Sequence, residues 1–322
     1  MKFGVRLPNL GPLAGQDAIR KVALKAEELN YDFLTVNDHI AWPDEYKYHL
    51  SSGSAELVDK MERANDYYES VATLSYVAGL TERIRLIVTC IVPALRNPIV
   101  LAKQLMTLQS LSRGRFILGI GIGNVRPEFE QMGIPWKKRA SMTNEYMEVL
   151  KAFFSSQDKS VSYNGTYVQF NGIEMFPRTR IPMWLGGKFV RPTMERVAKF
   201  GDGFIPSGNP QDFTDGLSKL DVILAEHGRK RTELELAAEP MVCIAKTDEE
   251  ARNISAKTIG LYAGGALEKG GVVGAPDTCA TKIGGYREAG VQVMELRIIS
   301  RGLDHMLEEM EIFATKIAPR FT

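Results

Sequence analysis

Residues 84–123 read IRLIVTCIVPALRNPIVLAKQLMTLQSLSRGRFILGIGIG. Two apolar runs rich in β-branched residues, 84–92 and 115–123, flank a stretch from Pro98 to Leu111 with apolar residues at helical spacing. This pattern predicts a strand, a helix and a second strand. The two strands are expected to be parallel, because a helix that crosses over one face of a sheet returns the chain in the same direction.

The same alternation of strand and helix extends over the whole chain. We expect eight strands, in residues 3–8, 33–40, 84–92, 115–123, 182–187, 202–206, 234–245 and 291–299, each followed by a helical segment. Eight such units favour a closed α/β fold, a (β/α)8 TIM barrel, which typically needs about 250 residues. An open doubly wound sheet is the alternative that the same alternation allows.

We interpret residues 1–322 as a single barrel domain, because no linker or low-complexity stretch divides them. The residues beyond those of a minimal barrel fall in three insertion segments, 43–66, 161–170 and 264–276. The second contains Asn164-Gly165 between alternating residues, which predicts a small hairpin.

Composition excludes several classes of function. Forty Lys and Arg against 39 Asp and Glu give a formal net charge of +1, so no overall field favours nucleic acid or an anionic membrane. Three widely spaced cysteines indicate neither a disulfide framework nor a zinc site, and the expected location is the reducing cytoplasm. The longest strongly apolar run is about half of the ~20 residues that span a bilayer, so no membrane segment is expected.

The residues after the second predicted strand carry the chemistry that the sequence offers. Asn37-Asp38-His39 ends this strand, and the other histidines lie in helical segments or in the first insertion. An imidazole exchanges protons near neutral pH, so we expect His39 to be catalytic, with the adjacent Asp38 orienting it. A structural Asp-His pair that caps a barrel loop is the alternative. Neither a metal-binding motif nor a serine hydrolase motif is present.

Glycines stand at the ends of two further strands. Gly119, Gly121 and Gly123 alternate with apolar residues, so all three are expected on one strand face, where a flat or bulky group could approach the backbone. Relief of crowding inside the barrel is the alternative. Gly186-Gly187-Lys188 precedes a helix start, an arrangement that suits a phosphate as well as a simple turn.

Six segments together resemble the luciferase-like flavin and deazaflavin superfamily: KFGVRLPN, AEELNYDFLTVNDHI, TCIVPALRNP, LSRGRFILGIGIGN, IPMWLGG and FGDGFIPSGNPQDF. The resemblance implies a (β/α)8 barrel that binds FMN or the deazaflavin coenzyme F420 with its ring in the barrel mouth. It favours F420, because Asp38-His39 matches the Asp-His pair of the deazaflavin branch. It also implies a non-prolyl cis peptide at the end of the third strand, for which Cys90-Ile91 is the candidate.

The resemblance implies the remaining site residues. The expected cofactor-binding residues are Asp38, His39, Cys90, Ile91, Gly121, Ile122, Gly123, Asn124, Gly186, Gly187 and Lys188. Trp42 is expected beside the substrate, although a loop anchor would also explain it. Asn124 departs from part of the family, where a glutamate serves as a second acid or base, and a neutral amide cannot exchange a proton at pH 7.

The expected function is an F420-dependent oxidoreductase that transfers a hydride between the deazaflavin and a small organic substrate. A flavin monooxygenase that uses reduced FMN, O₂ and a partner reductase is the first alternative. A flavin-binding protein without catalytic activity is the second. The resemblance also implies a homodimer.

Overall fold

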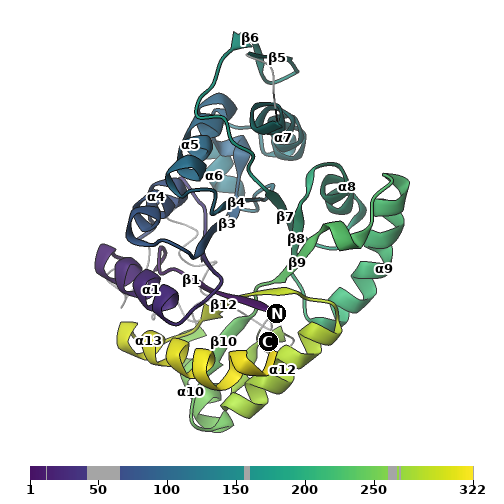
Figure 1. Cartoon of the computed structure of the whole chain (residues 1–322). Helices are drawn as coiled ribbons and strands as arrows, with labels where there is room; N and C mark the ends of the chain where they lie inside the picture. The colour runs from purple at the N-terminus through teal and green to yellow at the C-terminus, as the bar shows by residue number, and fades with distance from the viewer. Residues whose placement is uncertain (12, 42–65, 156–159, 260–266, 268–269, 322) are drawn as a thin grey trace.

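The computed structural model describes residues 1–11, 13–41, 66–155, 160–259, 267 and 270–321. Eight parallel strands form the barrel (Figure 1), in the order β1 (Lys2–Arg6), β2 (Phe33–Val36), β3 (Arg85–Ile91), β4 (Phe116–Ile120), β7 (Met183–Gly187), β8 (Gly203–Pro206), β9 (Glu235–Ala238) and β12 (Val293–Ile298). β12 also pairs with β1, which closes the ring. The predicted (β/α)8 barrel is confirmed, and this pairing excludes the open sheet.

Helices surround the barrel (Figure 1): α1 (Gln16–Glu28), α4 (Ser70–Leu80), α5 (Pro98–Leu111), α6 (Arg126–Gln131), α7 (Arg139–Ser155), α8 (Arg191–Phe200), α9 (Pro210–Glu226), α10 (Asp248–Ile259), α12 (Pro276–Glu288) and α13 (Leu303–Ile312). α1 illustrates why they pack there. Its Ile19, Val22 and Ala26 are buried on one face against the strands, while Asp17 and Lys25 lie in its first and last turns.

The barrel interior contains its own apolar layer. One side chain from each of seven strands forms it: Phe33, Ile87, Ile117, Trp184, Ile205, Ala237 and Val293. The eighth strand contributes Gly4, where an added Cβ would lie 2.2 Å from the Phe33 ring. Gly4 therefore leaves the space that Phe33 fills, and the layer closes the barrel below the carboxyl ends of the strands.

The seventh predicted strand, residues 234–245, divides into two. β9 ends at Ala238 and stays in the barrel, whereas β10 (Met241–Ile244) pairs with β12 and with β11 (Val272–Gly274) outside it. Pro240 lies between them and cannot donate a ladder hydrogen bond, which accounts for the break. β11 also places an unpredicted strand inside the third insertion.

Of the other two predicted insertions, 43–66 lies almost entirely outside the described residues and 161–170 lies within them. The second is the predicted hairpin, in which β5 (Val161–Asn164) pairs antiparallel with β6 (Gln169–Ile173) beside α7 and away from the barrel (Figure 1). The first lies outside the described residues, apart from Asp66.

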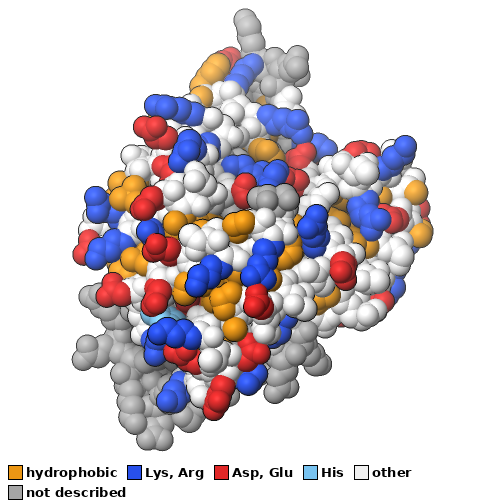
Figure 2. Space-filling view, turned by 60° about the horizontal axis from the view of Figure 1, so that its bottom comes forward, with side chains coloured by type: hydrophobic (Ala, Val, Ile, Leu, Met, Phe, Trp, Pro, Cys, Tyr) orange, Lys and Arg blue, Asp and Glu red, His pale blue; other side chains and the backbone are white. Residues whose placement is uncertain are grey.

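The surface carries both signs of charge. On the face in Figure 2, Lys and Arg side chains alternate with Asp and Glu, and neither sign covers a large continuous area. This distribution agrees with the near-zero net charge. Among the described residues, no helix is long and apolar enough to cross a membrane.

Candidate active site

A cavity of about 890 Å³ opens at the carboxyl ends of the barrel strands. It is lined by most of the predicted cofactor-binding residues, namely Asp38, His39, Cys90, Gly121, Ile122, Gly123, Asn124, Gly186, Gly187 and Lys188. Ile91 is not among them, because its side chain is buried in the layer between strands and helices, so its assignment to the cofactor site is corrected. Trp42 lies outside the described residues.

The end of β3 has an irregular backbone, although one residue earlier than predicted. The non-prolyl cis peptide joins Thr89 to Cys90, not Cys90 to Ile91. Val88 pairs with Leu118 and Ile91 pairs with Ile120, so β3 has one more residue in this stretch than β4. Since Ile91 is already back in register, the irregularity falls on the preceding pair and brings Cys90 to the cavity.

The three alternating glycines have three different surroundings. A Cβ on Gly119 would lie 2.1 Å from the Val88 carbonyl oxygen, which is crowding within the barrel. Gly123 has a φ of +75° and abuts the Phe129 ring. Gly121 lines the cavity, and an added Cβ there would meet only the Cys90 Cβ, at 3.3 Å. The predicted glycine-lined face is therefore shorter than expected: it includes Gly121 and its neighbours but not Gly119, which is explained by crowding within the barrel.

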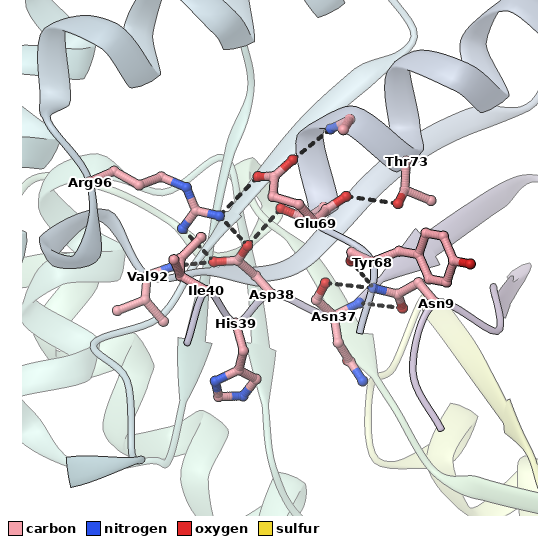
Figure 3. Close-up of polar contacts among 12 residues, drawn as sticks. Asn9, Asn37, Asp38, His39, Ile40, Tyr68, Glu69, Thr73, Val92 and Arg96 are labelled. Carbon is pink, nitrogen blue, oxygen red and sulfur yellow. Dashed lines mark hydrogen bonds and ion pairs between the residues drawn. The ribbon is translucent and has the colours of Figure 1, made fainter. Parts of the chain in front are cut away.

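Asp38 is held in a network that does not include the imidazole (Figure 3). Its carboxylate accepts two hydrogen bonds from Arg96, one from Ser70 Oγ at 2.7 Å and one from the Val92 N–H at 3.1 Å. Its side chain is fully buried. Asp38 and His39 point to opposite sides of the chain, as adjacent residues in extended backbone do. The predicted role of Asp38 in orienting His39 is wrong.

Glu128, not Asp38, orients the His39 imidazole. Its Oε2 lies 2.7 Å from His39 Nδ1, and its Oε1 accepts hydrogen bonds from the backbone N–H groups of Ile40 and Ala41. The Glu128 side chain is 1% exposed and that of His39 is 19% exposed. A buried carboxylate at Nδ1 favours the tautomer with a proton on that nitrogen, which makes Nε2 the basic one.

Sequence reasoning missed Glu128 and Arg96. Glu128 lies in α6, which has only six residues, so no helical period distinguishes its buried position from those of the exposed Arg126 and Glu130. Arg96 follows a short 3₁₀ turn, Pro93–Leu95, so no strand or helix pattern indicates where its side chain points. The single available signal was a charged residue close to an otherwise apolar strand end.

A charged wall, which we define as Arg6, Glu239, Glu295 and Arg297, lies on the side of β1, β9 and β12. Arg6 donates hydrogen bonds to Glu295 Oε1 and, at 2.7 Å, to Glu239 Oε2. Burial lowers the pKa of Arg6, but the two carboxylates more than compensate, so the net shift is upward. Arg6, Glu239 and Arg297 line the cavity, and none of the four was predicted.

The sequence matches the profile of a known protein family. The profile described as luciferase-like monooxygenase matches residues 1–264. The chain belongs to this family. The predicted superfamily is thereby confirmed, together with membership of a family of oxidoreductases.

Relatives within the luciferase-like family are distant. An uncharacterized protein of Mycobacterium tuberculosis is 31% identical over 56% of this chain and 64% of its own. The 5,10-methylenetetrahydromethanopterin reductase of Archaeoglobus fulgidus is 28% identical over 53% of this chain and 51% of its own. The matched region thus spans less than two thirds of either relative. The FMNH₂-dependent dimethylsulfone monooxygenase of Pseudomonas putida is 23% identical over 80% of this chain and 79% of its own.

Solved structures agree with the barrel. Monooxygenase RslO1 of Streptomyces bottropensis superposes with a TM-score of 0.84 at 21% identity, over 100% of both chains. The coenzyme F420-dependent tetrahydromethanopterin reductase of Methanopyrus kandleri gives 0.77 at 22% identity, over 100% of this chain and 99% of that one. At these identities the likeness concerns the fold of the luciferase-like family.

Proposed function

We propose that this protein is an F420-dependent oxidoreductase that transfers a hydride between the deazaflavin and a small organic substrate. The observation that carries the proposal is the glycine-lined cavity beside His39, an imidazole held by a buried carboxylate. When bound, the cofactor supplies or accepts the hydride.

The cavity residues fit a flat ring. Gly121, just after β4, and Gly186 line this side of the cavity without side chains, and the Cys90 side chain packs against Gly186, where an added Cβ would lie 2.5 Å from Cys90 Sγ. We assign the ring to this side, against Cys90, Gly121, Ile122 and Gly123. Lys188, next to the start of α8, is assigned to a phosphate of the cofactor.

His39 carries a proton in this scheme. Glu128 at Nδ1 fixes the ring orientation and leaves Nε2 as the atom that gives a proton to the substrate or takes one from it. Asp38 has no part in the proton transfer. Its hydrogen bonds with the Val92 N–H and with Arg96 hold together the segments that follow β2 and β3, and the first of these carries His39. Asn124 lines the cavity as a neutral amide, so a second proton carrier at that position is not part of the proposal.

Specific relatives favour the FMN alternative. A relative named as an FMNH₂-dependent monooxygenase matches over 80% of this chain, and a monooxygenase structure has the TM-score of 0.84 given above. The F420 assignment is supported by the Asp38-His39 pair and by similarity to methylenetetrahydromethanopterin reductases. We also expect a homodimer, which light scattering tests directly.

The decisive experiment compares the two cofactors. Purified protein is titrated with oxidised F420 and, separately, with FMN, and intrinsic tryptophan fluorescence is followed. Binding of F420 but not FMN supports the proposal. Binding of FMN alone contradicts it and favours the monooxygenase. Tight F420 binding without hydride transfer to any alcohol, aldehyde or imine favours a non-catalytic flavin-binding protein.

A further inference from the structure

The cavity contains more positive charge than its own carboxylates can pair. Lys188, Lys257, Arg297 and Arg301 line it, and no described residue forms an ion pair or a side-chain hydrogen bond with any of them. The lining carboxylates, Asp38 and Glu239, are bonded to Arg96 and Arg6. A ligand with negative charge would complete these interactions.

Arg297 differs from the other three cations. Lys188, Lys257 and Arg301 are exposed and can be hydrated, whereas Arg297 is partly buried within the charged wall. Burial lowers the pKa of Arg297, and Arg6 lowers it further, against the opposing effect of Glu239 and Glu295. A guanidinium has five N–H donors in a planar fork, and those of the Arg297 side chain make no hydrogen bond with a described residue. They are therefore available to an acceptor that enters the cavity.

The neighbouring carboxylates do not supply that acceptor. Arg6 donates hydrogen bonds to Glu295 Oε1 and Glu239 Oε2. Glu295 Oε2 is buried without a hydrogen-bond partner. Arg297 is therefore close enough to both carboxylates for them to affect its pKa, but it makes no hydrogen bond with either.

The barrel order places Arg297 opposite the ring side of the cavity. Gly121 follows β4, and Arg297 is on β12, with three strands between β4 and β12 in either direction around the barrel. His39 follows β2, which lies between them, and the Tyr67 ring contacts the His39 ring edge-on at 5.4 Å between centroids. A molecule between the ring and Arg297 thus has His39 at its side.

We propose that the substrate carries an oxyanion, a carboxylate or a phosphate, which Arg297 binds with paired N–H donors while the reacting carbon lies beside His39. This inference rests on the proposed function for the position of the reacting carbon. The guanidinium fork matches the two oxygens of either group, so the shared chemistry is the planar pair of anionic acceptors.

The test is anion binding, measured by isothermal titration calorimetry with three probes of similar shape: benzoate, phenyl phosphate and the neutral benzamide. Protein without cofactor and protein saturated with the cofactor that it binds are both used. The wild type should bind one anion at least about tenfold more tightly than benzamide, because an ionised acceptor strengthens the contact. The preferred anion identifies the substrate class.

Two variants locate the site. Arg297→Gln should weaken binding of the preferred anion by about tenfold or more, whereas Arg252→Gln, at an exposed arginine of α10 that does not line the cavity, should change it by no more than about twofold. Arg297→Lys should lie between them, because it keeps the charge and loses the fork. It also serves as the test if the glutamine variant does not fold.

Three results would overturn the inference: equal affinity for benzoate, phenyl phosphate and benzamide, no anion binding by the wild type, or unchanged binding in Arg297→Gln. Failure of the proposed function is a separate result. If neither F420 nor FMN binds, that function is lost, while the protein without cofactor still reports whether Arg297 holds an oxyanion.

Discussion

Glu128 Oε2 lies 2.7 Å from His39 Nδ1 and joins the first turn of α6 to the segment just after β2, with 89 residues between the two positions in the sequence numbering. The same carboxylate also fixes the backbone immediately after His39, through the N–H groups of Ile40 and Ala41. One buried side chain therefore sets both the orientation of the imidazole and the path of the chain that carries it.

His39→Asn should lower kcat by about 10²- to 10⁴-fold, the usual range for loss of a proton carrier. Affinity for the cofactor should change little, since Asn has no steric demand beyond that of His. Steady-state kinetics and fluorescence titration measure the two quantities. His227→Asn, at a histidine in α9's C-cap away from the cavity, is the control. An unaltered kcat in His39→Asn would remove this residue from the mechanism.

Glu128→Gln should lower kcat by about 10- to 100-fold, as loss of a partner that orients a functional imidazole does. KM and cofactor affinity should change less than kcat, because Glu128 acts through His39. The exposed Glu130→Gln, two residues along the same helix, should behave as wild type. If the double variant His39→Asn/Glu128→Gln is much less active than His39→Asn alone, Glu128 does not work through the imidazole.

Arg96→Met should destabilise the fold by about 3–5 kcal/mol, because it leaves the fully buried Asp38 carboxylate without its cation. Urea unfolding followed by circular dichroism measures this. Arg180→Met removes an exposed arginine paired with Asp202 and should cost only about 0–1 kcal/mol. Equal losses in the two variants would contradict the assigned role of Arg96.

Gly119→Ala and Gly121→Ala should separate crowding from cofactor binding. The first adds a methyl group 2.1 Å from the Val88 carbonyl oxygen and should cost about 1–3 kcal/mol or more in stability. The second meets only the Cys90 Cβ at 3.3 Å, so the fold should tolerate it while cofactor affinity falls by about tenfold. Full cofactor affinity in Gly121→Ala would place the ring elsewhere.

Glu27→Gln tests a carboxylate far from the cavity. Burial raises the pKa of Glu27, but hydrogen bonds from the backbone N–H groups of Arg83, Ile84 and Glu82 outweigh this effect, so the pKa lies below its ordinary value of 4.5. A lowered pKa contributes stability above the unfolded-state value that is lost as the pH falls through the folded-state value. The difference in unfolding free energy between wild type and variant should therefore be full at pH 7 and shrink as the pH falls below 4.5 and through the lower folded-state pKa. A difference independent of pH would contradict this.

The sequence predicts the barrel well because each strand-helix unit carries its own periodicity. Pro98 to Leu111, for example, identifies a helix without knowledge of its neighbours, and α5 has these bounds. The site residues on strand ends were accessible for the same reason, and Gly121, Lys188 and His39 all line the cavity. These positions follow from local pattern and the rule that barrel sites form at the carboxyl ends.

What the sequence could not give is which side chains meet across the barrel. Glu128 reaches His39 and Arg96 reaches Asp38 over 89 and 58 residues, and no periodicity encodes such pairs. The cis peptide was misplaced by one residue because strand register depends on pairing with β4. Arg297 reads in the sequence as one alternating position in a strand, and only the closed ring shows it to be opposite Gly121.

The Asp38 carboxylate has a mechanical consequence. Through Ser70, Val92 and Arg96 it clamps the start of α4, the exit of β3 and the approach to α5 into one unit. Moving these three elements apart would leave the buried Asp38 carboxylate without its hydrogen-bond partners, which is costly. We therefore expect this side of the barrel opening to stay rigid while ligands enter and leave.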